Sequence, residues 1–135
     1  MSFIIHRKAA MSFIQNRYIS LALMGAALAQ PAMAADPVAG AATFKQRCQM
    51  CHVVTPGQKP SIAPNLAGVV GRKAGSTEFA GSAALKAYGK TWTPALLDQW
   101  LAGPMKLVPG TRMVISVSDA KDRANLIAYL QGLKK

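Results

Sequence analysis

Acidic residues and cysteines are both scarce in this sequence. Five Asp and Glu stand against 16 Lys and Arg among 135 residues, which gives a formal net charge of +11 at pH 7. So basic a balance favours partners that carry negative charge. The only cysteines are Cys48 and Cys51, so the chain can form one disulfide at most and is not a scaffold held together by several.

Long hydrophobic runs are missing as well. A mostly apolar stretch, residues 18–29, follows Arg17, but it is too short to span a bilayer well, which argues against a transmembrane anchor. Residues 32–34 are Ala-Met-Ala, a small-x-small cleavage site. Residues 1–34 are therefore predicted to be a secretory signal peptide, cleaved near Ala34 and Ala35.

The start of translation has two candidates. The first four residues, Met-Ser-Phe-Ile, recur at residues 11–14. A start at Met11 would leave a signal peptide of ordinary length. The sequence alone leaves both starts open.

The remaining residues, 35–135, are enough for one small domain. They contain 13 Lys and Arg against 5 Asp and Glu, a net charge of +8. Nucleic acid is not the expected partner, because the signal peptide removes the chain from the cytoplasm and the basic residues are scattered. We expect a monomer that is peripheral to the membrane at most.

Helix starts are marked by a capping residue followed by proline. Asp36-Pro37 and Thr93-Pro94 predict two such starts, and a last helix is predicted from Ser118 or Asp119. Apolar residues at helical spacing follow each start. These predicted faces are Ala41, Phe44 and Cys48; Leu96, Leu97, Trp100 and Leu101; and Leu126, Ile127, Leu130 and Leu133.

Long stretches rich in glycine and proline separate these helices. Residues 53–75 and 106–117 are predicted to be loops, with a short helix at 82–87 between them. A loop as long as the first is unusual in a small domain unless it wraps a large apolar cofactor. With no convincing strand, the fold class is all-α, with three to five helices and long loops around one cofactor.

The sequence Cys48-Gln-Met-Cys51-His52 is the C-x-x-C-H pattern of covalent haem attachment. Two intervening residues form a short turn that presents both thiols to the two vinyl groups on one porphyrin edge. His52 then lies under the iron as the proximal ligand. It is also the only histidine of residues 35–135.

Three other interpretations explain the motif less well. A thioredoxin-like redox pair needs a β-α-β context, and none is visible. A zinc site needs about four ligands, whereas this region offers two cysteines and one histidine. A structural disulfide would leave His52 without a role.

The second axial ligand decides whether the haem is closed or open. Residues 35–135 contain three methionines, Met50, Met105 and Met113. Met50 lies between the anchoring cysteines and is expected to point away from the distal face. Met113 lies in a loop that can fold back over the haem, so it is the predicted distal ligand; a thioether there would raise the reduction potential.

Further motifs give the chain a specific resemblance. Their residues are the haem motif, Gly40 and Phe44, Pro64-Asn65-Leu66 with Gly68, Gly71-Arg72-Lys73 with Gly75, Trp92, Pro104, Pro109-Gly110-Thr111-Arg112-Met113, and Leu126-Ile127-Ala128-Tyr129-Leu130. On these residues the region from Gly40 to Leu130 resembles a class I cytochrome c of the mitochondrial cytochrome c and bacterial cytochrome c2 group.

The resemblance implies roles for the matching residues. The Pro64 carbonyl would accept a hydrogen bond from the His52 imidazole and so fix the orientation of its ring. Arg72 and Trp92 would bind a buried haem propionate, with Thr111 close to it. Met113 would be the distal ligand, and the first and last helices would cross at Gly40 with Phe44 and Leu126 with Tyr129.

The chain also departs from the family. It has Gly81 where the family often has a tyrosine that binds a propionate, and Trp100 where the family usually has a tyrosine near the ligand sulfur. We hypothesise that the indole N–H of Trp100 donates in place of that tyrosine. After Met113 the family has an aromatic residue and a glycine, and here Ile115 and Val117 stand there.

The expected function is that of a soluble periplasmic electron carrier with one haem c. Its expected partners are membrane redox complexes of a respiratory chain or periplasmic dehydrogenases with acidic docking surfaces. A positive ring around the exposed haem edge would steer them. The residues predicted for it are Lys45, Arg47, Lys59, Lys106 and Arg112. The alternatives are a peroxidase-like haem enzyme or a sensor, both with an open distal site.

Overall fold

The computed structural model describes residues 34–59, 62–77 and 83–135, and all of them fall in one compact unit, residues 33–135. The predicted signal peptide, Ala34 apart, and the alternative start at Met11 lie outside the described residues. No helix of the described ranges is both long enough and apolar enough to cross a membrane.

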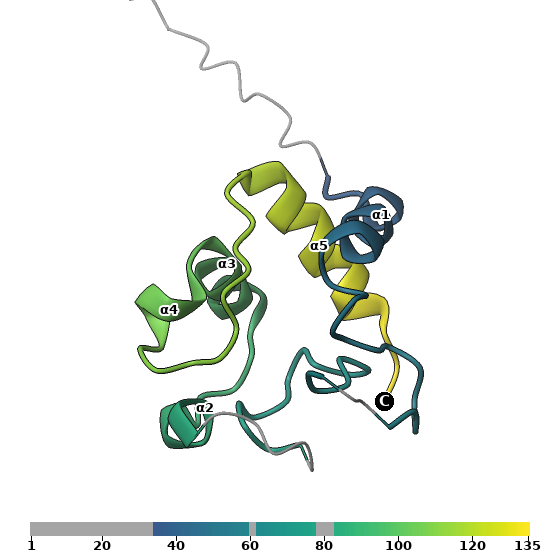
Figure 1. The fold of residues 1–135 in the computed structure, drawn as a ribbon. Helices are drawn as coiled ribbons and strands as arrows, with labels where there is room; N and C mark the ends of the chain where they lie inside the picture. Colours follow the sequence, from purple (N-terminus) through teal and green to yellow (C-terminus); the bar gives the residue numbers. More distant parts are fainter. Residues whose placement is uncertain (1–33, 60–61, 78–82) are drawn as a thin grey trace, which may run out of the picture. The chain divides into compact units, whose positions relative to one another are not determined.

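The regular structure of the described residues is helical (Figure 1). Its elements are α1 (Pro37–Arg47), α2 (Ala83–Tyr88), α3 (Pro94–Ala102), α4 (Pro104–Leu107) and α5 (Ala120–Gly132). Within the described ranges, β-pairing is limited to an isolated bridge between Lys73 and Thr91. The prediction of an all-α fold with three to five helices is confirmed.

The three longer helices begin at the predicted caps. The Asp36 side chain accepts from the Val38 N–H at 2.8 Å. The Thr93 hydroxyl accepts a hydrogen bond from the Leu96 N–H of α3 at 3.1 Å. The Asp119 carboxylate accepts one from the Asp122 N–H in the first turn of α5 at 2.8 Å. Each cap satisfies a backbone N–H that the helix itself leaves without a partner.

Two helix boundaries differ from the predictions. The loop predicted over 106–117 begins later, because α4 already includes residues 106 and 107. Pro104 ends α3 as predicted, but its fixed φ also suits the first position of a new helix, where its missing N–H costs nothing. The short helix predicted at 82–87 is α2 (Ala83–Tyr88), which ends one residue later than predicted; residue 82 lies outside the described ranges.

Helices α1 and α5 cross at a close contact, visible in Figure 1. Gly40 allows it, since a Cβ there would overlap the backbone carbonyl of Asn125. Phe44 and Tyr129 stack with ring centroids 5.6 Å apart, and the Asp36 N–H donates to Asn125 Oδ1 at 2.8 Å. The predicted crossing residues therefore lie in this contact.

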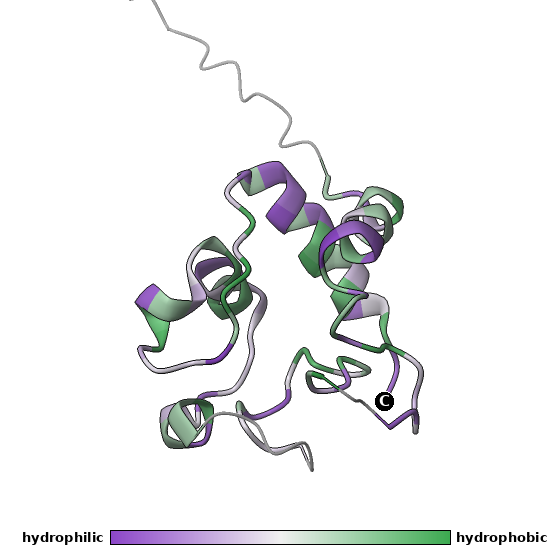
Figure 2. Cartoon of the chain, viewed as in Figure 1, coloured by the Kyte–Doolittle hydropathy of each residue, from purple (hydrophilic) through white to green (hydrophobic). Residues whose placement is uncertain are grey.

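The core follows the apolar face of each long helix. In Figure 2 the first turns of α5 are hydrophilic and its middle is hydrophobic. Helix α3 also packs against α5. The buried apolar side chains are Phe44, Val69, Ala74, Trp92, Leu97, Trp100, Leu101, Val108, Val117, Leu126, Ile127 and Leu130.

Candidate functional site

The C-x-x-C-H motif forms a tight turn at the end of α1. Cys48 is the C-cap, and its N–H donates to the Phe44 carbonyl at 2.8 Å. The N–H groups of Cys51 and His52 both donate to the Cys48 carbonyl, at 3.0 and 2.9 Å. This turn brings two free thiols and the imidazole to the wall of one cavity. Met50, between the cysteines, is 86% exposed and points to solvent.

The imidazole of His52 is fixed in one tautomer. Its Nδ1 lies 2.7 Å from the Pro64 carbonyl oxygen, and because that oxygen can only accept, Nδ1 carries the proton. Burial lowers the pKa of His52 below its ordinary value, although the bond to Pro64 opposes this shift. A neutral ring with a protonated Nδ1 leaves the Nε2 lone pair available to a metal.

The cavity has a volume of about 310 Å³ and opens beside the motif. Its wall is formed by the end of α1, the loop after the motif, α2, α3, the segment between them, and the loop that contains Met113. The lining residues are Arg47, Cys48, Cys51, His52, Ile62, Ala63, Pro64, Leu66, Leu85, Trp92, Trp100, Thr111, Arg112, Met113, Val114 and Ile115. A smaller apolar cavity of about 50 Å³ shares Cys48, His52, Leu66, Trp100 and Met113 with it.

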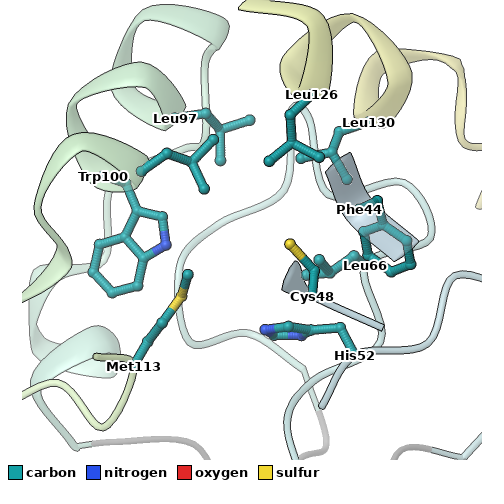
Figure 3. Close-up of a pocket in the computed structure, with 10 residues that line it drawn as sticks. Phe44, Cys48, His52, Leu66, Leu97, Trp100, Met113, Leu126 and Leu130 are labelled. Carbon is teal, nitrogen blue, oxygen red and sulfur yellow. The ribbon is translucent and has the colours of Figure 1, made fainter. Parts of the chain in front are cut away.

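Figure 3 shows the smaller cavity from within. Trp100 and Met113 lie on one side, and Cys48, His52 and Phe44 lie on the other. The Met113 thioether and the His52 ring thus face the same space from two segments that are 61 positions apart in the chain.

Thr111 and Trp92 line the larger cavity and are both buried. The Met113 N–H donates to the Thr111 hydroxyl at 3.4 Å, which ties the methionine to the residue two positions before it. Trp92 packs on Trp100 with ring centroids 5.2 Å apart, so the two indoles form one wall.

Arg72 lies outside the residues that line the cavity. Its Nη1 donates to the Ala67 carbonyl at 3.0 Å and its Nη2 to the Asn65 carbonyl at 2.8 Å. Burial lowers the pKa of this guanidinium. In the structure Arg72 therefore braces the loop that presents Pro64, and propionate binding by Arg72 stays a prediction.

The predicted positive ring divides into two groups. Arg47 and Arg112 line the larger cavity. The other three, Lys45, Lys59 and Lys106, are exposed but do not line it. The cavity also has exposed apolar residues at its rim, Ile62, Val114 and Ile115. The sequence did not single out Ile62 or Val114, although apolar residues in a polar loop were a usable signal.

Part of the apolar wall comes from residues whose roles were not predicted. Leu66 and Leu85 line the larger cavity, and Leu97 lines the smaller one. Leu66 was noted within a motif and Leu97 within a helical face, but neither pattern shows that the side chain borders a cavity. The predicted departure at Gly81 lies outside the described residues.

The site fits a covalently held haem and does not fit a zinc ion. Two thiols stand at one edge of an apolar cavity, next to a neutral imidazole and across from a thioether. Among the described residues, no group of three or more His, Cys, Asp or Glu could hold a metal ion by itself. Fold and site together define a small all-α protein built around c-type haem.

Comparison with known proteins agrees with this class. Residues 37–134 match the cytochrome c family. Cytochrome c2 of Rhodomicrobium vannielii is 46% identical over 117 residues, which cover 83% of this chain and 93% of that protein. Cytochrome c2 of Rhodoblastus acidophilus is 43% identical over 103 residues, covering 75% and 95%.

The fold also resembles that of a known cytochrome. The structure of cytochrome cH from Methylobacterium extorquens superposes with a TM-score of 0.65 at 47% identity, covering 70% of this chain and 96% of that one. The chain belongs to the cytochrome c family. It is accordingly an electron carrier with one covalently bound haem c, and not an enzyme.

Proposed function

We propose that this chain is a periplasmic one-electron carrier with His52 and Met113 as the axial ligands of its haem iron. The observation that carries the proposal is that these two side chains, from opposite parts of the chain, border the same apolar cavity beside the cysteine pair. The bound haem supplies an iron that alternates between Fe(III) and Fe(II).

The motif residues hold the group and orient it. Cys48 and Cys51 would bind its two vinyl carbons through thioethers, and the turn between them sets the spacing of the sulfurs. His52 would bind the iron through Nε2, because Nδ1 donates to Pro64. That hydrogen bond fixes the ring plane and makes the imidazole a stronger donor.

The remaining lining residues exclude water and set the potential. The apolar wall around the cavity, including Leu66 and Trp100, keeps the site dry, and Met113 would favour Fe(II) over Fe(III). Trp92 and Thr111 line the part of the cavity where we place a propionate. With two ligands retained in both states, little would reorganise when an electron moves.

The rim of the cavity is where we place the docking surface. Arg47 and Arg112 supply positive charge there, and Ile62, Val114 and Ile115 are exposed beside them. A charged rim steers an acidic partner, while the apolar contact stays weak enough for rapid release. We place membrane redox complexes and periplasmic dehydrogenases among such partners.

Replacing the distal methionine tests the ligand assignment. In the haem-loaded protein, Met113→Ala should abolish the methionine–iron charge-transfer band and lower the midpoint potential by at least about 59 mV, the one-electron equivalent of tenfold. It should also admit carbon monoxide. Met105→Ala is the matched control, because Met105 is exposed on α4 and does not line the cavity. If Met113→Ala behaves like Met105→Ala, the assignment is wrong.

The location has its own test. Export with cleavage before Ala35 predicts that the protein is recovered from the periplasmic fraction and that N-terminal sequencing begins Ala-Asp-Pro. Recovery from the cytoplasm with Met1 or Met11 at its N-terminus would contradict it.

A further inference from the structure

One guanidinium joins three segments of the chain on the distal side. Arg123, in α5, donates from Nε to Asp98 Oδ1 in α3 at 2.7 Å. Its Nη1 donates to the carbonyls of Val117 and Ser118 at 3.1 and 2.7 Å. The Arg123 side chain is 13% exposed and that of Asp98 is 46% exposed, so the contact is largely enclosed on the arginine side.

Val117 is the point at which the loop that contains Met113 is anchored. It is 2% exposed, and its N–H donates to the Leu101 carbonyl of α3 at 2.8 Å. With its own carbonyl bound by Arg123, Val117 is fixed to α3 on one side and to α5 on the other.

The stretch between Met113 and this anchor makes no hydrogen bonds of its own to the described residues. Residues 114–116 are exposed and make no hydrogen bond to the rest of the described chain. The other end of the segment is held through Thr111, which accepts from the Met113 N–H. Met113 itself packs against the core, and hydrogen bonds hold its segment at two places, Thr111 and Val117.

The second attachment is close enough to matter. Four residue steps separate Val117 from Met113, and an extended chain of that length reaches about 14 Å at most. The attachment at Val117 therefore limits how far Met113 can move, and release of Val117 from α3 and α5 would widen that range. A half-exposed ion pair contributes little free energy of folding by itself. We therefore infer that Asp98 acts mainly by orienting the guanidinium of Arg123 toward the two carbonyls.

We propose that Asp98 and Arg123 are positioning residues for Met113: they clamp the end of its loop to α3 and α5 and so keep the thioether over the iron. This inference rests on the proposed function, in which Met113 is the distal ligand. Without the clamp, the loop opens more often and an external ligand takes the place of the thioether more easily.

The test measures imidazole binding to the oxidised, haem-loaded protein. Removing the hydrogen bonds of a charged group from a partly buried site should raise the affinity for imidazole roughly tenfold in Arg123→Gln. Asp98→Asn should raise it roughly threefold, because the carbonyl bonds can persist. The imidazole affinity of Arg123→Lys should lie between that of Arg123→Gln and that of the unaltered protein. The methionine–iron charge-transfer band should weaken in the same order.

Two controls separate positioning from charge and from stability. Asp122→Asn changes the net charge as Asp98→Asn does, but its carboxylate makes no hydrogen bond or ion pair with the described residues. Ile127→Val removes a buried methyl from α5, which lowers the free energy of unfolding, and Ile127 takes no part in the hydrogen bonds of Arg123. Both should bind imidazole as the unaltered protein does.

The outcomes are distinguishable. If Arg123→Gln and Asp98→Asn bind imidazole like the controls while Met113→Ala opens the site, the clamp is refuted and the proposed function stands. If Met113→Ala itself changes nothing, the ligand assignment has failed and the clamp with it. An equal rise in Ile127→Val would also overturn the clamp, since stability alone would then explain it. Should Arg123→Gln fail to fold, Asp98→Asn and Arg123→Lys decide the matter.

Discussion

At the scale of single residues, Trp100 is the departure with the clearest chemical consequence. It is buried, lines both cavities and packs against Trp92 with the two rings tilted to each other. Tryptophan offers a donor but no acceptor, unlike the tyrosine that the family usually has there. In Figure 3 the indole and Met113 lie on the same side of the smaller cavity, and we hypothesise that the indole N–H donates to the thioether sulfur.

Trp100→Phe should weaken the methionine–iron bond, because it removes the donor and leaves part of the indole volume empty. We expect a weaker methionine–iron charge-transfer band and a free energy of unfolding lower by about 1–3 kcal/mol. Trp100→Tyr restores a hydrogen-bond donor. It should therefore recover most of the charge-transfer band but less of the free energy of unfolding. Spectra and denaturant titrations of the two haem-loaded variants check this, and equal bands in both would contradict the donor role.

Residue roles were predictable where the chemistry is local. The C-x-x-C-H spacing required adjacent thiols and imidazole, and the turn supplies them. The contacts of Arg123 were not predictable, because its partner Asp98 lies 25 positions away and no local pattern pairs them. Arg72 shows a different limit: its nitrogens bind carbonyls only five and seven positions away in the same loop, but an irregular loop has no periodicity from which such contacts could be predicted.

At the scale of elements, the crossing of α1 and α5 depends on one missing side chain. Gly40→Ala would push a methyl group into the Asn125 carbonyl and the Tyr129 side chain. Overpacking of this kind should lower the free energy of unfolding by about 1–3 kcal/mol. Thermal or denaturant unfolding of the haem-loaded protein measures it.

Gly132→Ala is the matched control for that substitution. Gly132 is also helical, but a Cβ there meets nothing within 4 Å. Since alanine is the better helix former, this variant should be neutral or up to about 1 kcal/mol more stable. Equal destabilisation by both substitutions would show that the close approach at Gly40 is not the cause.

Helix starts were predictable and some helix ends were not. Asp36, Thr93 and Asp119 cap as expected, because capping depends on residues two or three positions away. The short helix α4 was missed, since a proline both ends one helix and suits the start of another. The long loop was predicted from its glycines and prolines, but its course around a cavity depends on distant contacts such as that of Pro64 with His52.

At the scale of the whole molecule, we expect the excess of positive charge to act on how fast acidic partners bind. Steering can raise association rates by roughly 10–10³-fold. If about five cations contribute equally, each one raises the association rate roughly two- to fourfold. Arg112→Gln should therefore slow electron transfer with an acidic redox partner by about that factor at low salt, and the loss should shrink as salt screens the charges.

Lys121→Gln serves as the comparison for Arg112→Gln. It removes the same charge from an exposed position in the first turn of α5 that does not line the cavity. Its rate should stay close to that of the unaltered protein at every salt concentration. Rates that fall equally in the two variants would mean that net charge, and not the cavity rim, steers the partner.

The central claim is a closed site between His52 and Met113. Its most direct test is the optical spectrum of the purified haem-loaded protein, oxidised and then reduced with ascorbate, with and without carbon monoxide. A closed site predicts a low-spin spectrum, full reduction by ascorbate, a methionine–iron charge-transfer band and no response to carbon monoxide. A high-spin component or ready carbon monoxide binding would contradict it, because either requires an open distal position.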